Sequence, residues 1–328
     1  MRDAHGRKLD YLRISITDRC NLRCAYCMPA DGVPRLPHAA VLRYEEIRRL
    51  VGLARDLGFA HFRVTGGEPL VRRGAVAFLA DLARDLAGRD LALTTNGTLL
   101  APIARRLRAA SLRRVNISLD TLRPGRFAQL TRRDDWAAAW AGVEAALAAG
   151  FAPVKLNVVV VAGFNDDEVL DFARLTHKRP LHVRFIELMP LGEGCALPGG
   201  LVGADEILAE LAAAGSLVRP GPAAGPGGAG PAEVYRWGDG VGTVGVIPAL
   251  SNCFCGDCNR LRLTATGQLE PCLAAERAID LRGPLRAGAG DGVLKDLFRL
   301  AAAIKPAGHT MPEGTAPGKR RRMSRIGG

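Results

Sequence analysis

The sequence predicts an α/β fold, a partial (β/α)6 TIM-like barrel with a C-terminal extension. Strand-like and helix-like segments alternate between residues 11 and 188 with short connections, and such alternation gives parallel strands with helices packed outside. Beyond residue 188 the alternation stops, and from residue 233 the predicted segments are shorter and cysteines occur again. We therefore expect a barrel domain over residues 1–200 and a second domain over residues 201–328.

The individual segments have the period of their expected structure. Residues 11–17 alternate as a strand does, and residues 154–161 are rich in β-branched side chains. Residues 44–57 have apolar side chains at helical spacing, residues 136–149 are Ala-rich, and both segments stop at a glycine. By the same criteria the other strands are 61–65, 91–95, 114–119 and 181–188, and the other helices are 73–87, 99–109, 166–176 and 204–214.

The composition indicates a globular protein without a targeting segment. Apolar residues make up 48% of the 328 residues and charged residues 24%, which is typical of soluble proteins. The N-terminus is polar and no long apolar run occurs, so we expect no signal peptide, no membrane span and a cytoplasmic location. In a reducing compartment, eight cysteines favour metal ligation over disulfides.

The net charge of +12 does not by itself select a partner. Basic surfaces bind nucleic acids, membranes or polyanionic small molecules. The alternative of a different class is a zinc-dependent nucleic-acid-binding protein, which would have clustered aromatic side chains for base stacking. Aromatic residues make up only 5% of this chain and do not interleave with its basic runs. We therefore expect neither a nucleic acid nor a membrane as partner.

Chemically useful residues fall at the ends of the predicted barrel strands. In barrels of this kind, reactive groups lie at the C-terminal ends of the strands. Cys20, Gly66, Thr94, Ser118 and Met189 all follow or end such strands. We expect them to face one site.

The first cysteine cluster follows the first strand. Cys20, Cys24 and Cys27 have the spacing C-x3-C-x2-C, and three thiolates can hold three irons of a [4Fe–4S] cluster while the fourth iron stays open. A zinc knuckle that lacks one ligand is the alternative, but no histidine lies between the three cysteines. Because an open metal position is typical of a reactive site, we expect a catalytic cluster here.

A second cysteine cluster lies near the C-terminus. Cys255, Cys258 and Cys272 have the spacing C-x2-C-x13-C and again offer three thiolates to a [4Fe–4S] cluster with one open iron. A structural zinc site completed by Cys253 is the alternative, since zinc sites with four thiolates are common. Cys195 and Cys253 are otherwise interpreted as free thiols.

The first triplet, with Tyr26 before its last cysteine, resembles the motif of the radical S-adenosylmethionine (SAM) superfamily. The segment Gly66-Gly67-Glu68-Pro69 resembles the GGEP element of that superfamily, in which glycine lets the backbone approach the amino-acid moiety of SAM. The resemblance implies that SAM binds the open iron and is cleaved to methionine and a 5′-deoxyadenosyl radical. The protein would supply placement and shielding.

Over nearly the whole chain, the order of motifs resembles the GTP 3′,8-cyclase family. This resemblance rests on the opening strand 13–20, on Arg260 and Arg262 between the ligands of the second cluster, and on the double glycine that ends segment 323–328. It implies a lyase of molybdenum cofactor biosynthesis that converts GTP to (8S)-3′,8-cyclo-7,8-dihydroguanosine 5′-triphosphate. The radical would remove the ribose C3′ hydrogen, guanine would contact the second cluster, and the C-terminal tail would reach the active site.

The resemblance also assigns roles to single residues. For SAM binding these are Tyr26, Gly67, Ser118 and Met189, and for GTP binding they are Arg13, Arg63, Thr94, Lys155, Arg260 and Arg262. Catalytic roles fall on Arg13, Arg260, Arg262, Gly327 and Gly328. Guanidinium groups match phosphate oxygens bidentately, and buried cations need an anion nearby. The alternatives are a strand-end cap for Ser118, core packing for Met189, and internal salt bridges of the cations with Glu68, Asp120 or Glu187.

The resemblance further implies three partners. They are a flavodoxin- or ferredoxin-like electron donor, a downstream cyclic pyranopterin monophosphate synthase and a second copy of the chain in a homodimer. A peptide-modifying radical SAM maturase is the nearest alternative, but such enzymes usually carry more C-terminal cysteines. The Gly/Pro/Ala-rich segment 219–231 is expected to be a mobile loop and receives no function.

Overall fold

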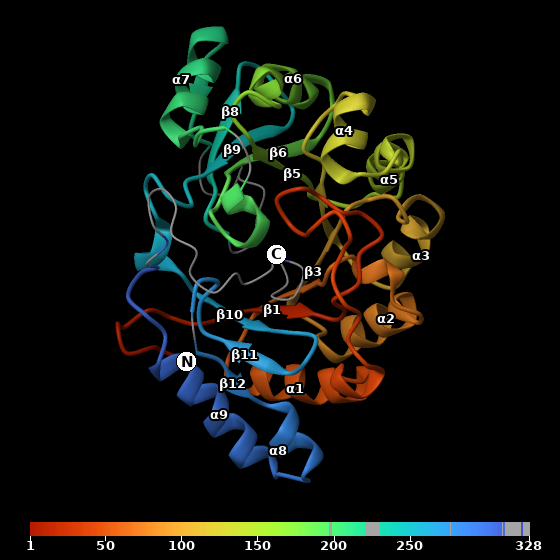
Figure 1. Cartoon of the computed structure of the whole chain (residues 1–328), viewed down its shortest axis with the longest axis vertical. Helices are drawn as coiled ribbons and strands as arrows, with labels where there is room; N and C mark the ends of the chain where they lie inside the picture. The colour runs from red at the N-terminus through yellow and green to blue at the C-terminus, as the bar shows by residue number, and fades with distance from the viewer. Residues whose placement is uncertain (197–198, 221–229, 276, 310, 312–322, 324–328) are drawn as a thin grey trace.

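In the computed structural model, the predicted strands form one sheet in chain order. The structure describes residues 1–196, 199–220, 230–275, 277–309, 311 and 323. The strands are β1 (Tyr11–Ser15), β2 (His61–Thr65), β3 (Asp90–Thr95), β4 (Arg114–Ser118), β5 (Val154–Val160) and β6 (Leu181–Glu187). Each pairs in parallel with the next, and the sheet curves into an open arch (Figure 1). The α/β fold with a partial six-fold barrel is confirmed.

Helices cover the outer face of this arch (Figure 1). Five agree with predicted helices, namely α1 (Tyr44–Asp56), α2 (Ala75–Asp85), α3 (Ala104–Ala109), α5 (Trp136–Ala148) and α6 (Val169–Lys178). Short 3-10 turns at Ala101–Ile103 and Asp166–Glu168 precede α3 and α6. The sequence analysis does not predict α4 (Pro124–Thr131), because its eight residues are too few to establish a helical period.

The C-terminal region adds one parallel strand to each edge of the arch. β9 (Thr243–Ile247) pairs with β6, and β10 (Arg260–Leu263) pairs with β1. Antiparallel strands continue outward, with β8 (Glu233–Trp237) and β7 (Leu217–Val218) beyond β9, and β11 (Gln268–Glu270) and β12 (Ile279–Asp280) beyond β10. The sequence analysis missed these strands because they lie outside the β/α alternation. The domain boundary at residue 200 stays a prediction.

The segment between β9 and β10 crosses the open side of the arch. Because these two strands lie at opposite edges, residues 248–259 must bridge them (Figure 1). The segment ends beside the start of β1, where Tyr11 N donates to Asn259 O at 3.2 Å. Cys255 and Cys258 therefore lie at the N-terminal end of the parallel strands, whereas Cys20 follows the C-terminal end of β1.

One apolar core joins the arch to the C-terminal helices. Phe59 and Phe298 are fully buried, and their rings meet edge to face with 6.3 Å between centroids. Phe298 belongs to α9 (Asp291–Ala303), which follows α8 (Arg282–Arg286) and packs on α1. The predicted helix α7 (Ala204–Ala214) packs on α6. Within the described ranges, every helix is too short or too polar to cross a membrane.

A buried carboxylate anchors the crossing segment at the C-terminal end of β6. Glu187 is fully buried and accepts hydrogen bonds from Ala204 N at 2.8 Å, Leu250 N at 2.7 Å and Ser251 N at 3.0 Å. The Ser251 hydroxyl donates to the same carboxylate. Ala204 N is buried and the other donors are partly buried, so Glu187 satisfies them and holds both α7 and the crossing segment to the barrel.

Replacing Glu187 by alanine should destabilise the fold. Glu187→Ala leaves the buried N–H of Ala204 and two partly buried N–H groups without an acceptor, so we expect the free energy of unfolding to fall by about 2 kcal/mol. Urea unfolding of the metal-free chain, followed by circular dichroism, measures this change. Glu206→Ala, at an exposed position of α7, is the matched control and should change stability by less than about 0.5 kcal/mol. Equal effects of the two substitutions would contradict the anchoring role.

Candidate functional site

A cavity of about 280 Å³ lies inside the arch, and most of the predicted site residues line it. All six predicted cluster ligands reach it, namely Cys20, Cys24, Cys27, Cys255, Cys258 and Cys272. Of the predicted SAM residues, Tyr26, Gly67, Ser118 and Met189 line it. Of the predicted GTP residues, Arg13, Arg63, Thr94, Arg260 and Arg262 line it. One cavity thus brings together both cysteine triplets and the predicted binding residues.

Three predicted residues are not part of this lining. Lys155 is buried on β5 and is not among the described residues that face the cavity. Gly327 and Gly328 lie outside the described residues, as does most of the predicted loop 219–231. Met323, shortly before the double glycine, does line the cavity.

The first triplet lies in a loop that α4 holds in place. Arg23 N donates to Thr131 O and Ala25 N donates to Leu130 O, both at 2.9 Å. These two bonds join the loop 20–27 to the C-terminal end of the helix that the sequence analysis missed. The spacing of the three cysteines is therefore supported by tertiary contacts as well as by the local sequence.

Two thiols of the first triplet, those of Cys20 and Cys24, resist ionisation in the absence of a cation. Burial raises the pKa of Cys20 to about 11. Burial, and next the neighbouring Cys27 and Asp120, raise the pKa of Cys24 well above its usual range. Thiolates bind metal ions, so a bound metal ion supplies the positive charge that this group of buried thiols needs.

Gly66 and Gly67 bring the loop after β2 into contact with the cysteine loop. A Cβ on Gly67 would lie 2.3 Å from Arg19 O, and one on Gly66 would lie 2.9 Å from Thr17 O. Gly67 N also donates to Thr17 O at 2.7 Å. The resemblance to the radical SAM superfamily explains these glycines by close approach to SAM. The structure adds a second reason, which is the close approach of two protein loops.

Two buried carboxylates border the first triplet. Glu68 accepts hydrogen bonds from the Thr95 hydroxyl at 2.8 Å and from Asn96 N at 2.7 Å, and burial raises its pKa to about 7. Asp120 accepts a hydrogen bond from the Tyr26 hydroxyl at 2.7 Å, and burial raises its pKa to about 6. Their hydrogen-bond donors are hydroxyl and backbone groups, so the expected alternative of ion pairs with the buried cations has no support at these two carboxylates.

Buried arginines occupy the middle of the cavity. Arg63 on β2, Arg184 on β6 and Arg262 on β10 are each less than one-tenth exposed, and Arg13 on β1 lies beside Arg262. Burial, followed by repulsion from Arg63, lowers the pKa of Arg184 to about 9. Burial, followed by repulsion from Arg260, lowers the pKa of Arg262 to about 10. A bound anion would relieve this repulsion.

Arg184 is a cavity residue that the sequence analysis missed. Its Nη2 donates to Asn116 Oδ1 at 2.8 Å and to Asn157 Oδ1 at 2.5 Å, so amides from two neighbouring strands orient the guanidinium. The signal was present in the sequence, because Arg184 and Ile186 alternate on the inward face of β6 and both line the cavity.

Lys155 lies next to this group of arginines. Burial first, and then Arg184 and Arg114, lower the pKa of Lys155 to about 6. In a cavity without an anion, its amine is therefore mostly uncharged near neutral pH. An anion that binds among these cations would favour the protonated form.

The second triplet lies among cations at the start of β10. Burial opposes ionisation of Cys258, but Arg260 and Lys305 outweigh this effect and lower its pKa to about 7. Cys255 and Cys272 line the same cavity. A thiol that ionises near neutral pH is prepared for metal ligation.

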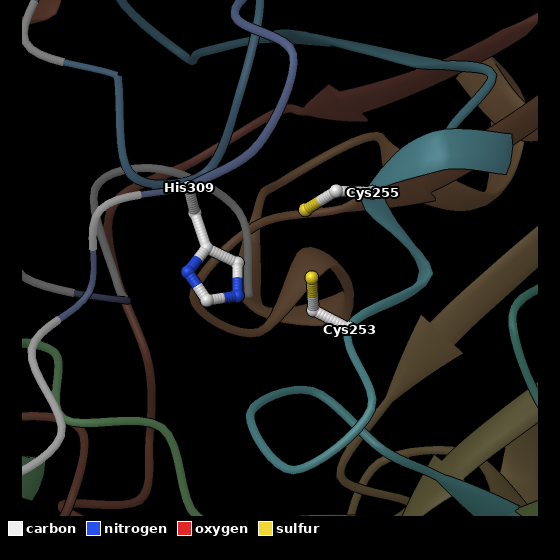
Figure 2. Close-up of side chains that lie close together, drawn as sticks. All are labelled: Cys253, Cys255 and His309. Carbon is white, nitrogen blue, oxygen red and sulfur yellow. The ribbon is translucent and has the colours of Figure 1, made fainter.

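A further group of donors lies at the edge of the second triplet. Figure 2 shows the ring of His309 beside the sulfurs of Cys253 and Cys255, and the ligand atoms of these residues lie within 4.8 Å of one another. A tetrahedral zinc ion with bonds of about 2.3 Å to sulfur needs ligand atoms about 3.8 Å apart. For the zinc alternative, the structure therefore offers Cys253, Cys255 and His309 as donors, in place of the four cysteines expected from the sequence.

The two predicted triplets have donor sets that fit iron–sulfur clusters. Each supplies three partly buried thiols to one cavity. In the described part of the chain, neither triplet is gathered within 4.8 Å as the group in Figure 2 is. Wider spacing suits a multi-iron cluster, in which each thiolate binds a different iron.

Two family models match this chain. The radical SAM superfamily model matches residues 14–176. The Molybdenum Cofactor Synthesis C model matches residues 181–311, the part that contributes β9, β10 and the second triplet.

Curated relatives match along their entire length. The chain is 53% identical to GTP 3′,8-cyclase from Heliobacterium modesticaldum and 52% identical to GTP 3′,8-cyclase from Pelotomaculum thermopropionicum, with 100% of each chain covered in both comparisons. Among solved structures, a radical SAM methyltransferase from Sphaerobacter thermophilus matches with a TM-score of 0.47 and 21% identity over 60% of each chain. Identity above one half over full length shows that this chain belongs to the GTP 3′,8-cyclase family of the radical SAM superfamily.

Proposed function

We propose that this chain is a radical SAM GTP 3′,8-cyclase, a lyase of molybdenum cofactor biosynthesis. Its product would be (8S)-3′,8-cyclo-7,8-dihydroguanosine 5′-triphosphate. The proposal is supported above all by one cavity that has a cysteine triplet at each end and buried arginines between them. When bound, the first cluster and SAM supply the 5′-deoxyadenosyl radical that removes the C3′ hydrogen of the GTP ribose, so that C3′ can bond to C8 of guanine.

At the first triplet, the chain binds and shields SAM. The cluster ligands would be Cys20, Cys24 and Cys27, and the SAM-binding residues would be Tyr26, Gly67, Ser118 and Met189. Glu68 is held in place by Thr95 and Asn96. Its buried carboxylate would accept a hydrogen bond from the amino group of SAM.

Between the triplets, the buried cations bind the triphosphate. A triphosphate carries about four negative charges, and guanidinium groups pair with phosphate oxygens bidentately. Arg63, Arg184 and Arg262 are shielded from water, which strengthens each ion pair. The full set of GTP residues would be Arg13, Arg63, Thr94, Lys155, Arg184, Arg260 and Arg262.

At the other end of the cavity, the second cluster and the tail complete the site. The cluster ligands would be Cys255, Cys258 and Cys272, with the open iron toward guanine and the catalytic arginines Arg13, Arg260 and Arg262 beside it. Met323 lines the cavity, which supports a catalytic role for Gly327 and Gly328, because a further four or five residues would span enough distance to reach GTP.

The remaining parts of the proposal concern partners and organisation. A flavodoxin- or ferredoxin-like protein would supply electrons, and cyclic pyranopterin monophosphate synthase would take the product. The chain would act as a homodimer in the cytoplasm. Residues 1–200 would provide the SAM site, and residues 201–328 would provide the second cluster.

Metal analysis tests whether both triplets hold clusters. After anaerobic reconstitution we expect about eight irons per chain, and about four after either Cys24→Ala or Cys258→Ala, because each substitution removes one ligand of one cluster. Cys24→Ala should abolish formation of 5′-deoxyadenosine from SAM. Both quantities are measured on the same sample, with and without GTP.

Cys253→Ser is the matched control for these substitutions. It removes a thiol close to Cys255 that the proposal does not use, so iron content and turnover should stay at the wild-type level. Four irons and one zinc in the wild-type chain, with the zinc lost in Cys253→Ser, would contradict the second cluster and favour the donor set of Figure 2.

Arg184→Met tests the cavity cation that the sequence analysis missed. Loss of a charge-assisted hydrogen bond to phosphate should weaken GTP binding by about 10- to 100-fold. Equilibrium binding of GTP to the enzyme without SAM measures this effect. Arg236→Met, at an exposed position of β8, should bind GTP as the wild type does. Unchanged affinity in Arg184→Met would remove Arg184 from the triphosphate site.

The pH dependence of GTP binding tests Lys155. Since the pKa of Lys155 is about 6 in the empty cavity, binding of a triphosphate near neutral pH should draw one proton onto its amine. The dissociation constant should therefore rise with pH above about 6, by up to tenfold per pH unit. Calorimetry in buffers of different ionisation enthalpy measures the proton uptake. Lys155→Met controls for titration of GTP itself, and equal uptake by the two proteins would refute the role.

A further inference from the structure

Lys305 is a buried lysine outside the set of predicted site residues. It follows α9, is 3% exposed and lines the same cavity. Its Nζ lies 3.5 Å from Cys258 Sγ, 2.9 Å from Arg260 O and 2.7 Å from Pro271 O. An ammonium group has three protons, so these partners use all of its donors.

The counter-charge of Lys305 comes from the second triplet. A buried ammonium needs an anion close by. None of the salt bridges among the described residues pairs Lys305 with a carboxylate. The ionisable group in contact with it is the Cys258 thiol, whose sulfur lies 3.5 Å from Nζ. The ammonium group and this ligand of the second triplet therefore form a charge-assisted pair.

Lys305 also joins the two separate parts of the triplet. Its contact Arg260 lies two residues after Cys258, and its contact Pro271 lies immediately before Cys272. The strands β10 and β11 separate these two cysteines in the chain. One ammonium group thus sets the position of one ligand relative to the other.

The segment that carries Lys305 is itself fixed by the N-terminus. Arg7 Nη1 donates to Cys255 O at 2.7 Å, and Arg7 Nη2 donates to Pro306 O at 2.6 Å. Asp3 holds the Arg7 guanidinium at 2.6 Å. Arg7 therefore fixes both the segment that carries Lys305 and the remaining cysteine of the triplet, Cys255.

We propose that Lys305 is a positioning residue for the second iron–sulfur cluster. Its ammonium group holds Cys258 and Cys272 at the correct spacing and stabilises negative charge on the cluster. This inference rests on the proposed function, because it requires a cluster on this triplet. Hydrogen bonds to cluster sulfurs and net charge near a cluster set its reduction potential. Lys305 would therefore make the second cluster easier to reduce.

The test compares three substitutions by potentiometric titration monitored by electron paramagnetic resonance. In the holoenzyme, and in a Cys24→Ala background that isolates the second cluster, Lys305→Met should lower the equilibrium constant for its reduction at least tenfold. That change corresponds to about 59 mV for one electron. Lys305→Arg keeps the charge and should restore most of the difference. Lys295→Met, which removes a lysine of α9 that pairs with Asp56, should leave the potential unchanged.

The iron content separates the possible outcomes. A Lys305→Met protein with about eight irons and a wild-type potential and spectrum would overturn the inference. If Lys305→Met retains only about four irons, the potential is measured on Lys305→Gln instead, which keeps a hydrogen-bond donor without the charge. A potential lower than that of the wild type supports the inference, and an unchanged potential overturns it. If the wild-type chain itself holds only about four irons, the proposed function fails and the inference fails with it.

Discussion

The parallel pairing of β10 with β1 is the interaction on which the rest of the site depends. In this register Arg262 lies beside Arg13, and Arg260 lies beside Tyr11 at the start of β1. A shift by one residue would turn both arginines to the opposite face of the sheet. It would also displace Cys258, which lies two residues before the strand. The pairing that closes one edge of the arch therefore also places the second triplet at the far end of the cavity from the first.

A second constraint is electrostatic, since the cavity gathers charges that burial makes costly. Arg63 repels Arg184 and Arg260 repels Arg262 in its middle. The thiols of Cys20 and Cys24 resist ionisation at one end. The empty cavity is thus less stable than one that holds metal ions at the thiols and an anion at the arginines. A ligand of opposite charge removes this cost when it binds, so the destabilisation contributes to the binding affinity.

The features that could be predicted from sequence are those encoded within short segments. The β/α alternation and the spacing of cysteines within residues 20–27 each lie inside a single window, so period and spacing suffice to find them. The placement of β9 and β10 at opposite edges is set by tertiary packing, which no local pattern reveals. His309 and Lys305 were missed for the same reason, because neither has a characteristic spacing from the second triplet. Arg184 differs from them, since the alternation of β6 would have shown that it faces inward.

The two ends of the cavity also differ in how far apart in sequence their parts lie. The first triplet is completed by loops after β1, β2 and β3 and by α4, all within the first half of the chain. The second requires both termini, because Arg7 contacts Cys255 across 248 positions and Lys305 reaches Cys258 only when α9 has packed on α1. Contacts of this kind close long loops and therefore cost more chain entropy than local ones. The packing of Phe298 against Phe59 therefore affects the site directly. It brings α9, and with it Lys305, to the end of the cavity where the second triplet lies.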